Sequence, residues 1–183
     1  SEMCIRDRYT FMNSKIKIRK AVLLDIDRLM EIFAKAREFM KNTGNPNQWI
    51  NGYPQRELIS DEILKGHCYV CCADSSDEFR ERIVATFCFI EGPDPTYSYI
   101  ENGSWPNNLP YYVIHRLASD GTVPGIAAAC IDWCSGVSPC LRADTHKDNK
   151  VMQHILERNG FKECGIIYVA NGTQRIAYQK DAK

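Results

Sequence analysis

One stretch of this chain combines a turn and a helix start in a way suited to binding an anion. The residues YVIHRLASDGTVPGIAAACIDWC read as an apolar strand, a turn with Gly and Pro, and a helix that starts near Gly125. Free backbone N–H groups at a helix start, together with the positive end of the helix dipole, bind phosphate oxygens without a basic side chain. Small residues at Gly125 and at 127–129 leave room for a pyrophosphate. The alternative is structural, because small residues also let a helix pack closely against a sheet.

A second helix start follows in the run DTHKDNKVMQHILERNGF. A strand ends there, Asp148 or Asn149 caps the next helix, and Asn159 with Gly160 closes that helix in a left-handed turn. These caps by themselves indicate structure and not chemistry.

Nine cysteines raise the question of disulfides and metal binding. Their number is odd and most lie in apolar runs, so buried free thiols fit better than disulfides. Cys68 and Cys71 have a C-x-x-C spacing, but in the strand-like run HCYVCCA that spacing directs them to opposite faces. No second pair completes a tetrahedral zinc site, so we expect no metal.

Hydrophobic periodicity predicts the elements that must position these groups. We expect strands at 15–22, 67–73, 82–91, 110–119, 140–146, 161–170 and 175–180. We expect helices at 26–40 with Asp25 as the cap, from Ser60 to Gly66 with Ser60 as the cap, at 125–136 and at 149–160. The strand-helix-strand unit in the second half implies one parallel pair, and the hairpins around it imply antiparallel pairs. The predicted fold is therefore α/β, a mixed, largely antiparallel twisted sheet with helices on both faces.

Length and composition predict one globular domain. The chain has 183 residues, of which 44% are hydrophobic and 25% charged. Residues 1–11 lack a period and resemble translated sequencing-adapter read-through, so we assign them to a leader of artefactual character and the domain to 12–183. A formal net charge of zero argues against nucleic acid or anionic membrane as a general partner. No apolar run reaches the roughly 20 residues that span a bilayer and no secretory signal is visible, so we expect a cytoplasmic protein.

The two helix starts, their order and the stretch from Ile114 to Phe161 resemble the GNAT superfamily of N-acetyltransferases. The resemblance covers most of residues 15–180 and is closest at VIHRLA, at LRADTHKDNKVMQHILERNGF and at CGIIY. It implies a GNAT-like acyl-CoA N-acyltransferase fold with acetyl-CoA as co-substrate. It also implies direct transfer of the acetyl group, in a ternary complex, to a primary amine of a small molecule or protein.

The resemblance implies a cofactor site in which three positions depart from the family pattern. Thr122 stands where the family's pyrophosphate turn has Arg or Gln, and Pro124 removes one N–H from that turn. Leu156 stands where the family often has a Tyr that donates a proton to the leaving thiolate. The implied cofactor-binding residues are Leu117, Ser119, Thr122, Gly125, Ile126, Ala127 and Asn149, the last beside the pantetheine arm.

The implied reaction needs a base, because an amine is protonated at neutral pH. Our candidates, in order, are Glu91, His115 and His146, with Glu101 as a further acid nearby. Each has a structural alternative: a solvated strand-end charge for Glu91, a satisfied core histidine for His115 and a helix cap for His146. Strand alternation directs His115 away from the face of Ile114 and Arg116.

Aromatic side chains in the irregular segments 42–60 and 92–110 are candidates for an acceptor pocket. The residues we assign to it are Trp49, Tyr53, Tyr99 and Trp105. The alternative is that about half of these rings fill the core beneath a long loop.

Two other functions fit the sequence. Cys88 is a formal candidate for a nucleophile in a cysteine acyltransferase, although no motif pairs it with a histidine. A non-catalytic acyl-CoA sensor or interaction module on the same fold is favoured by the departures at Thr122 and Leu156. The expected partner is a small-molecule or peptide amine, and a homodimer fits the resemblance.

Overall fold

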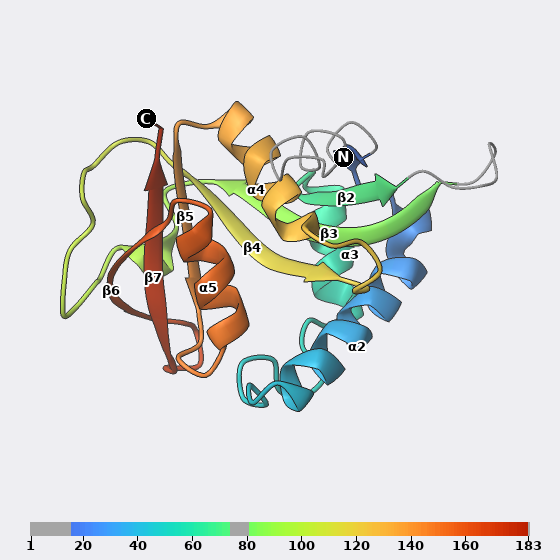
Figure 1. Cartoon of the computed structure of the whole chain (residues 1–183), viewed down its shortest axis with the longest axis horizontal. Coiled ribbons are helices and arrows are strands. Elements are labelled where there is room, and N and C mark those ends of the chain that lie inside the picture. Colours follow the sequence, from blue (N-terminus) through green and yellow to red (C-terminus); the bar gives the residue numbers. More distant parts are fainter. Residues whose placement is uncertain (1–15, 74–80, 183) are drawn as a thin grey trace, which may run out of the picture.

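The computed structural model describes residues 16–73 and 81–182. The predicted leader, the domain start at Met12 and most of the polar connection after residue 73 lie outside these residues. The described strands form one sheet in the order β1-β2-β3-β4-β5-β7-β6 (Figure 1). Among the described strand pairs, β4 and β5 alone run parallel, and the others are antiparallel.

The helices and strands follow one another as the periodicity predicts. The strands are β1 (Ile16–Lys20), β2 (Cys68–Ala73), β3 (Arg82–Glu91), β4 (Tyr112–Ser119), β5 (Cys140–Thr145), β6 (Lys162–Tyr168) and β7 (Gln174–Asp181). The helices are α2 (Ile26–Asn42), α3 (Arg56–Leu64), α4 (Ile126–Val137) and α5 (Lys150–Arg158), with 3-10 turns η1 (Leu23–Asp25) and η2 (Pro95–Tyr97). The mixed, largely antiparallel α/β fold is confirmed.

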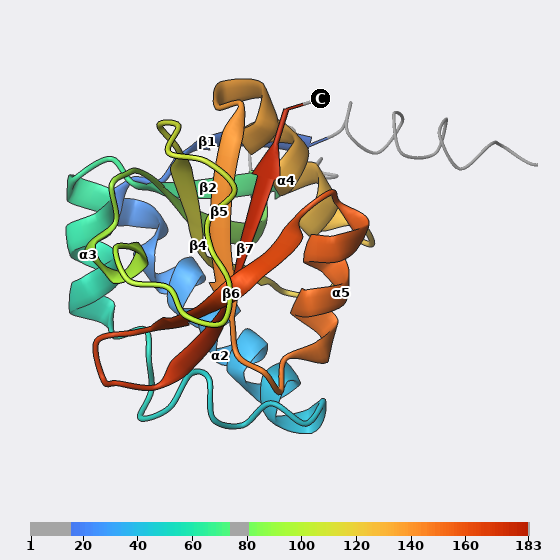
Figure 2. The same cartoon turned by 90° about the vertical axis from the view of Figure 1, so that its left-hand side faces the viewer.

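Helices cover both faces of the sheet. Figure 2 shows α2 and α3 on one side and α4 and α5 on the other. Cys68 belongs to the core under α2 and α3, whereas Cys71 belongs to the core under α4 and α5, so the two face opposite ways as predicted. The eight described cysteines are buried free thiols. Within residues 16–73 and 81–182, no cluster of three or more potential ligands could hold a metal ion, and no helix is long and apolar enough to cross a membrane.

Of the two predicted caps in the first half of the chain, Ser60 is wrong, and Asp25 is the N-cap residue of α2 by position only. Helix α3 starts after Gln55, so Ser60 lies inside it. The early start lets Ile59 and Ile63 pack on one buried face, and burying an Ile is worth about 1.5–3 kcal/mol, against about 1 kcal/mol for a cap. The Asp25 side chain does not cap α2, because its carboxylate accepts from the N–H of Val22 (2.8 Å) and from Arg19 (2.8 Å).

The segment between β3 and β4 is packed against the sheet and not only beside the site. Figure 2 shows it crossing over β6, and Glu101 forms an isolated antiparallel bridge with Ile166. Gly103 lies so close to β6 that a Cβ on it would stand 2.0 Å from the carbonyl oxygen of Cys164. Residues 101–103 are therefore held against β6. This contact restricts where the earlier part of the segment, around Asp94, can lie.

Replacing Gly103 by Ala should destabilise the fold by roughly 1–3 kcal/mol, because a backbone atom cannot yield to the added methyl group. Gly136→Ala is the matched control: it lies inside α4 with nothing within 4 Å of the added Cβ, so it should stabilise by about 0.4–1 kcal/mol. Denaturant unfolding of both variants measures this, and a shift of the same sign in both would contradict the packing described.

Candidate active site

Strands β4 and β5 separate soon after they meet. They pair only at Tyr112 with Leu141 and at Val113 with Arg142, and Figure 1 shows β4 turning away from β5 beyond that point. Both strands continue, so backbone groups on their facing edges have no ladder partner there. The result is an opening in the middle of the sheet, next to α4 and α5.

A bulge in β4 stands at this opening. Cys88 pairs with His115 and Thr86 pairs with Ala118, so one residue of β3 opposes two residues of β4, Arg116 and Leu117. Arg116 has a φ of 53°, a left-handed conformation that is uncommon outside glycine. A bulge breaks the strict alternation of side chains. The prediction that His115 faces away from Ile114 and Arg116 holds for Ile114, because Ile114 pairs with Phe89 of the core under α4 and α5 whereas His115 pairs with Cys88 of the core under α2 and α3. It is wrong for Arg116, whose guanidinium reaches Glu62 of α3 (3.9 Å) and so lies on the side of His115.

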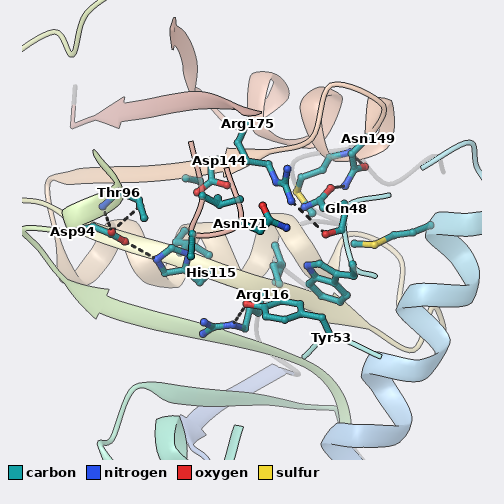
Figure 3. Close-up of a pocket in the computed structure, with 18 of the residues that line it drawn as sticks. Gln48, Tyr53, Asp94, Thr96, His115, Arg116, Asp144, Asn149, Asn171 and Arg175 are labelled. Carbon is teal, nitrogen blue, oxygen red and sulfur yellow. Dashed lines mark hydrogen bonds and ion pairs between the residues drawn. The ribbon is translucent and has the colours of Figure 1, made fainter. Parts of the chain in front are cut away.

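The cavity has a volume of about 640 Å³ and passes between the two separated strands. This volume lies in the range of roughly 300–1,000 Å³ that is usual for small-molecule sites. Figure 3 shows its polar lining, with Asp94 and His115 at one end, Gln48 and Asn149 at the other, and Asp144, Asn171 and Arg175 between them. Its apolar lining includes Met40, Trp49, Ile50, Ile90, Ile131, Met152, Leu156 and Val169.

Asp94 and His115 form a hydrogen-bonded pair on the cavity wall. Nε2 of His115 lies 3.1 Å from Oδ2 of Asp94, and Oδ1 of Asp94 accepts from the N–H (2.9 Å) and hydroxyl (2.7 Å) of Thr96. Burial would raise the pKa of Asp94, but the bonds from His115 and Thr96 outweigh it and lower the pKa to about 2. The ionised carboxylate favours the tautomer with the proton on Nε2, which leaves Nδ1 of His115 as a proton acceptor.

A second carboxylate, that of Asp144, also lines the cavity. It projects from β5 and accepts a hydrogen bond from the hydroxyl of Tyr97 (2.6 Å). Burial, followed by the charge of Asp144, raises the pKa of Tyr97 well above its ordinary value, so this tyrosine stays protonated. Two carboxylates and one imidazole thus surround the end of the cavity where a cationic amine would be favoured.

The side-chain oxygen of Gln48 ties the loop between α2 and α3 to the junction of β5 and α5. Oε1 lies within hydrogen-bond distance of four donors, the side-chain nitrogens of Asn45 (3.0 Å) and Asn149 (2.9 Å), the hydroxyl of Thr145 (3.3 Å) and the N–H of His146 (3.4 Å). Asn149 in turn caps α5 by accepting from the N–H of Met152 (3.0 Å). The loop wall of the cavity is therefore fixed to a helix cap.

The predicted anion-binding turn follows the C-terminal end of β4, well past the point where β4 and β5 separate. Gly125 is the N-cap of α4 with a φ of 74°, and an added Cβ would meet nothing within 4 Å. The hydroxyl of Thr122 accepts from Nη1 of Arg82 (3.2 Å). The guanidinium of Arg82 in β3 therefore lies beside the turn. The turn itself has Thr122 at the position where the resemblance implies Arg or Gln.

The structure separates the three candidate bases. His115 lines the cavity and is half-buried. Glu91 is exposed at the end of β3, and neither Glu91 nor His146 is among the residues that line the cavity. Nδ1 of His146 accepts from the N–H of Asp148 (3.0 Å), and burial lowers the pKa of this histidine.

The other predicted site residues also divide. Leu117, Asn149, Trp49 and Tyr53 line the cavity, whereas Ser119, Thr122, Gly125, Ile126 and Ala127 lie along the strand end, the turn and the start of α4. Tyr99 is 61% exposed and packs on Tyr168 at 6.4 Å between ring centroids. Trp105 stacks between the Tyr97 ring at 5.2 Å and the guanidinium of Arg142 at 3.9 Å. Neither Tyr99 nor Trp105 lines the cavity. Trp105 packs against a buried cluster, as the structural alternative has it, whereas the exposed Tyr99 matches neither prediction.

Cys88 lies away from the cavity. A hydrogen bond with Cys68 outweighs burial and, with the charge of Arg116, lowers the pKa of Cys88. The thiol is nevertheless fully buried in the core under α2 and α3 and is not among the lining residues. A nucleophile must reach its substrate, so this placement gives the cysteine mechanism no support.

Sequence reasoning missed several polar residues of the cavity, namely Gln48, Asp94, Arg116, Asp144, Asn171 and Arg175. Asp94 carried the only usable signal, since an Asp two residues before a Thr in a Pro-rich turn is a common local cap. Gln48, Asn171 and Arg175 come from segments that meet only in the folded chain.

Comparison with solved structures identifies acetyltransferases that share this fold. The chain is 32% identical to an acetyltransferase of the GNAT family from Streptococcus agalactiae, with a TM-score of 0.81 over 92% of this chain and 96% of that one. A GNAT-family acetyltransferase from Listeria monocytogenes shares the fold at 17% identity and a TM-score of 0.67, over 91% and 94% of the two chains. The NatC complex bound to Gag peptide and CoA shares it at 15% identity and 0.51, over 92% and 99%. No protein-family model and no curated protein matches the chain.

Replacing Gln48 by Met keeps the side-chain length and removes the shared acceptor. The donors of Asn45 and Asn149 then lose their partner, so unfolding free energy should fall by about 1–3 kcal/mol. Gln55→Met is the matched control, because Gln55 is an exposed residue of the same loop and should change stability by no more than about 0.5 kcal/mol. Equal effects in denaturant unfolding would contradict the linking role of Gln48.

Proposed function

The chain belongs to the GNAT family of acetyltransferases, and we propose that it transfers an acetyl group from acetyl-CoA to a primary amine of a small molecule or peptide. The observation that carries this proposal is the cavity between the separated strands β4 and β5, with the Asp94–His115 pair on its wall. The NatC complex, which has the same fold, is bound to a peptide and CoA. This supports acetyl-CoA as the donor and a peptide amine as one class of acceptor.

The residues present fit acetyl-CoA. The amides of Gly125, Ile126 and Ala127 would hold the pyrophosphate, because the start of α4 is open where a Cβ on Gly125 would stand. Arg82, in contact with Thr122, would add positive charge beside it. Leu117 and Asn149 would contact the pantetheine arm along the cavity, with Ser119 at the strand end. Acetyl-CoA supplies the activated acetyl group as a thioester.

His115 is the residue best placed to accept the proton of the attacking amine. Its Nδ1 takes the proton, directly or through water, while the carboxylate of Asp94 stabilises the imidazolium. As the N–C bond forms and the C–S bond breaks, backbone N–H groups freed by the bulge at Arg116 and Leu117 can donate to the carbonyl oxygen. Leu156 carries no proton for the thiolate, so water or another side chain would serve that step.

A non-catalytic acyl-CoA sensor is the second candidate. Leu156 on the cavity wall favours it, because the leaving thiolate has no side-chain donor at that position. The Asp94–His115 pair argues for the enzyme, since a sensor needs no proton acceptor in its cavity. Thiol release from acetyl-CoA in the presence of an amine panel separates the two.

Gly125→Glu should abolish or strongly weaken acetyl-CoA binding in calorimetry, by at least about tenfold in Kd, because a carboxylate would replace the anion. Gly44→Glu is the matched control: Gly44 is also left-handed, with a φ of 84° and open space around the added Cβ, but it lies at the end of α2. It carries similar backbone strain and should bind within about twofold of the native chain. Equal weakening in both variants would contradict the site.

His115→Gln should lower kcat/KM for the amine by roughly 10²–10⁴ and remove the acidic limb of its pH–rate profile, while acetyl-CoA binding stays unchanged. Glu91→Gln, at an exposed strand end, should leave both rate and profile close to native. Loss of the limb in Glu91→Gln, with His115→Gln intact, would assign the base to the strand end instead.

A further inference from the structure

We propose that the acceptor is a small amine that also carries an anionic group, of which an α-amino acid is the simplest, and that Arg175 binds that group. This inference rests on the proposed function and names the class of acceptor. Its basis is a buried guanidinium on the cavity wall with no counter-ion in the described part of the chain.

Arg175 is held in place by neutral groups. It lies near the start of β7, is 7% exposed and lines the cavity (Figure 3). Nη1 donates to the hydroxyl of Thr173 (3.0 Å) and the carbonyl oxygen of Gln174 (2.9 Å), and Nη2 donates to the carbonyl oxygen of Gln48 (3.3 Å). A guanidinium has five N–H donors in a planar fork that matches a carboxylate, so donors remain for a ligand.

The charge of Arg175 is balanced less directly than the charges of the neighbouring arginines. Among residues 16–73 and 81–182, no carboxylate oxygen forms an ion pair with it within 4.0 Å, whereas Arg116 on the same wall has Glu62 at 3.9 Å. Arg142 is buried as well, but it lies between the rings of Trp105 and Tyr111 at 3.9 Å from each. Burial lowers the pKa of Arg175, and the charge of Asp144 opposes this only in part.

A buried charge without a partner is costly, and the cost falls when a ligand supplies the opposite charge. Arginine stays protonated in proteins, so the guanidinium does not neutralise itself. Arg175 therefore favours an anion in the cavity over a neutral group. Asn171 lies beside it in Figure 3; its Oδ1 accepts from Thr173 (3.0 Å), which leaves its Nδ2 to donate to the same anion.

The other charges of the cavity are arranged for a cation. Asp144 lies between His115 and Arg175 in Figure 3, and Asp94 lies on the side of His115 that is farther from Arg175. A ligand with an ammonium group toward Asp144 and His115 and an anion toward Arg175 matches this order of charges. The amine would then stand next to Nδ1 of His115. The rings of Trp49 and Tyr53, 6.2 Å apart, form an apolar wall for the rest of the ligand.

A purely structural role for Arg175 makes a different prediction. If the guanidinium only fixes the loop through the carbonyl oxygen of Gln48, its removal should lower stability and should lower activity toward every amine alike. If it binds an anion, its removal should raise KM for acceptors that carry one and spare those that do not.

The test uses pairs of acceptors that differ only in the carboxylate. Phenylalanine with phenethylamine, tryptophan with tryptamine, leucine with isoamylamine and histidine with histamine are compared by thiol release from acetyl-CoA. The native chain should acetylate at least one of these amino acids with a kcat/KM at least about tenfold above that of its partner amine. Arg175→Met should lower that kcat/KM roughly 100-fold, mainly through KM, and should leave the partner amine within about threefold.

Two further variants complete the test. Arg158→Met makes the same change at an exposed position of α5 and should keep the preference. Arg175→Lys keeps the charge without the planar fork and should restore part of it. Equal or better use of the amines that lack the carboxylate, equal loss for both members of a pair in Arg175→Met, or acetylation of neither class by a chain that binds acetyl-CoA would overturn the inference. Failure of the native chain to bind acetyl-CoA would overturn the proposed function itself, and the inference with it.

Discussion

The parting of β4 and β5 is the constraint on which the rest of the structure depends. Two parallel strands that share only two residue pairs leave unpaired backbone groups in the middle of a sheet, which is costly unless something else fills the opening. The bulge at Arg116 sets the direction in which β4 leaves. Helices α4 and α5 lie on one side of the opening, and the loops that carry Gln48 and Asp94, with the start of β7 at Arg175, close the other. The gap in the sheet and the cavity are thus one feature.

Electrostatics divides that cavity into regions with different preferences. Asp94 and Asp144 face His115 at one end, and the guanidinium of Arg175 stands farther along without a carboxylate within ion-pair distance in the described chain. Because the cavity is partly shielded from water, each charge acts more strongly than it would on the surface. The apolar rings between the loops contribute surface for packing and little direction.

Most of the fold could be predicted from the sequence, because alternation and helical spacing are local. The order of elements, the single parallel pair and the opposite faces of Cys68 and Cys71 all follow from that kind of pattern. Predictions failed where packing or an ion pair with a neighbouring element outweighed a capping preference. Burial of Ile59 and Ile63 moved the start of α3 away from Ser60, and Arg19 drew the carboxylate of Asp25 off the helix it was expected to cap.

The site was less predictable for two physical reasons. A one-residue bulge reverses the facing of every side chain beyond it, so alternation misplaced His115 relative to Arg116. The loops also lack a period, and Gln48 becomes a neighbour of Asn171 and Arg175 only when the hairpin between β6 and β7 meets the loop after α2 in the folded chain. The helix start at Gly125 could be predicted because its signal lies in consecutive residues, and its role in binding an anion stays a prediction.

The single oxygen of Gln48 has a consequence for how such a site can change over evolutionary time. One atom serves both the loop that shapes the acceptor wall and the cap of the helix beside the opening. A loop borrowed from a relative to admit a different amine would also have to bring an acceptor for the amide of Asn149. Diversification of this wall is therefore restricted to exchanges that preserve that atom, and the loop and the helix cap should be inherited together as one unit.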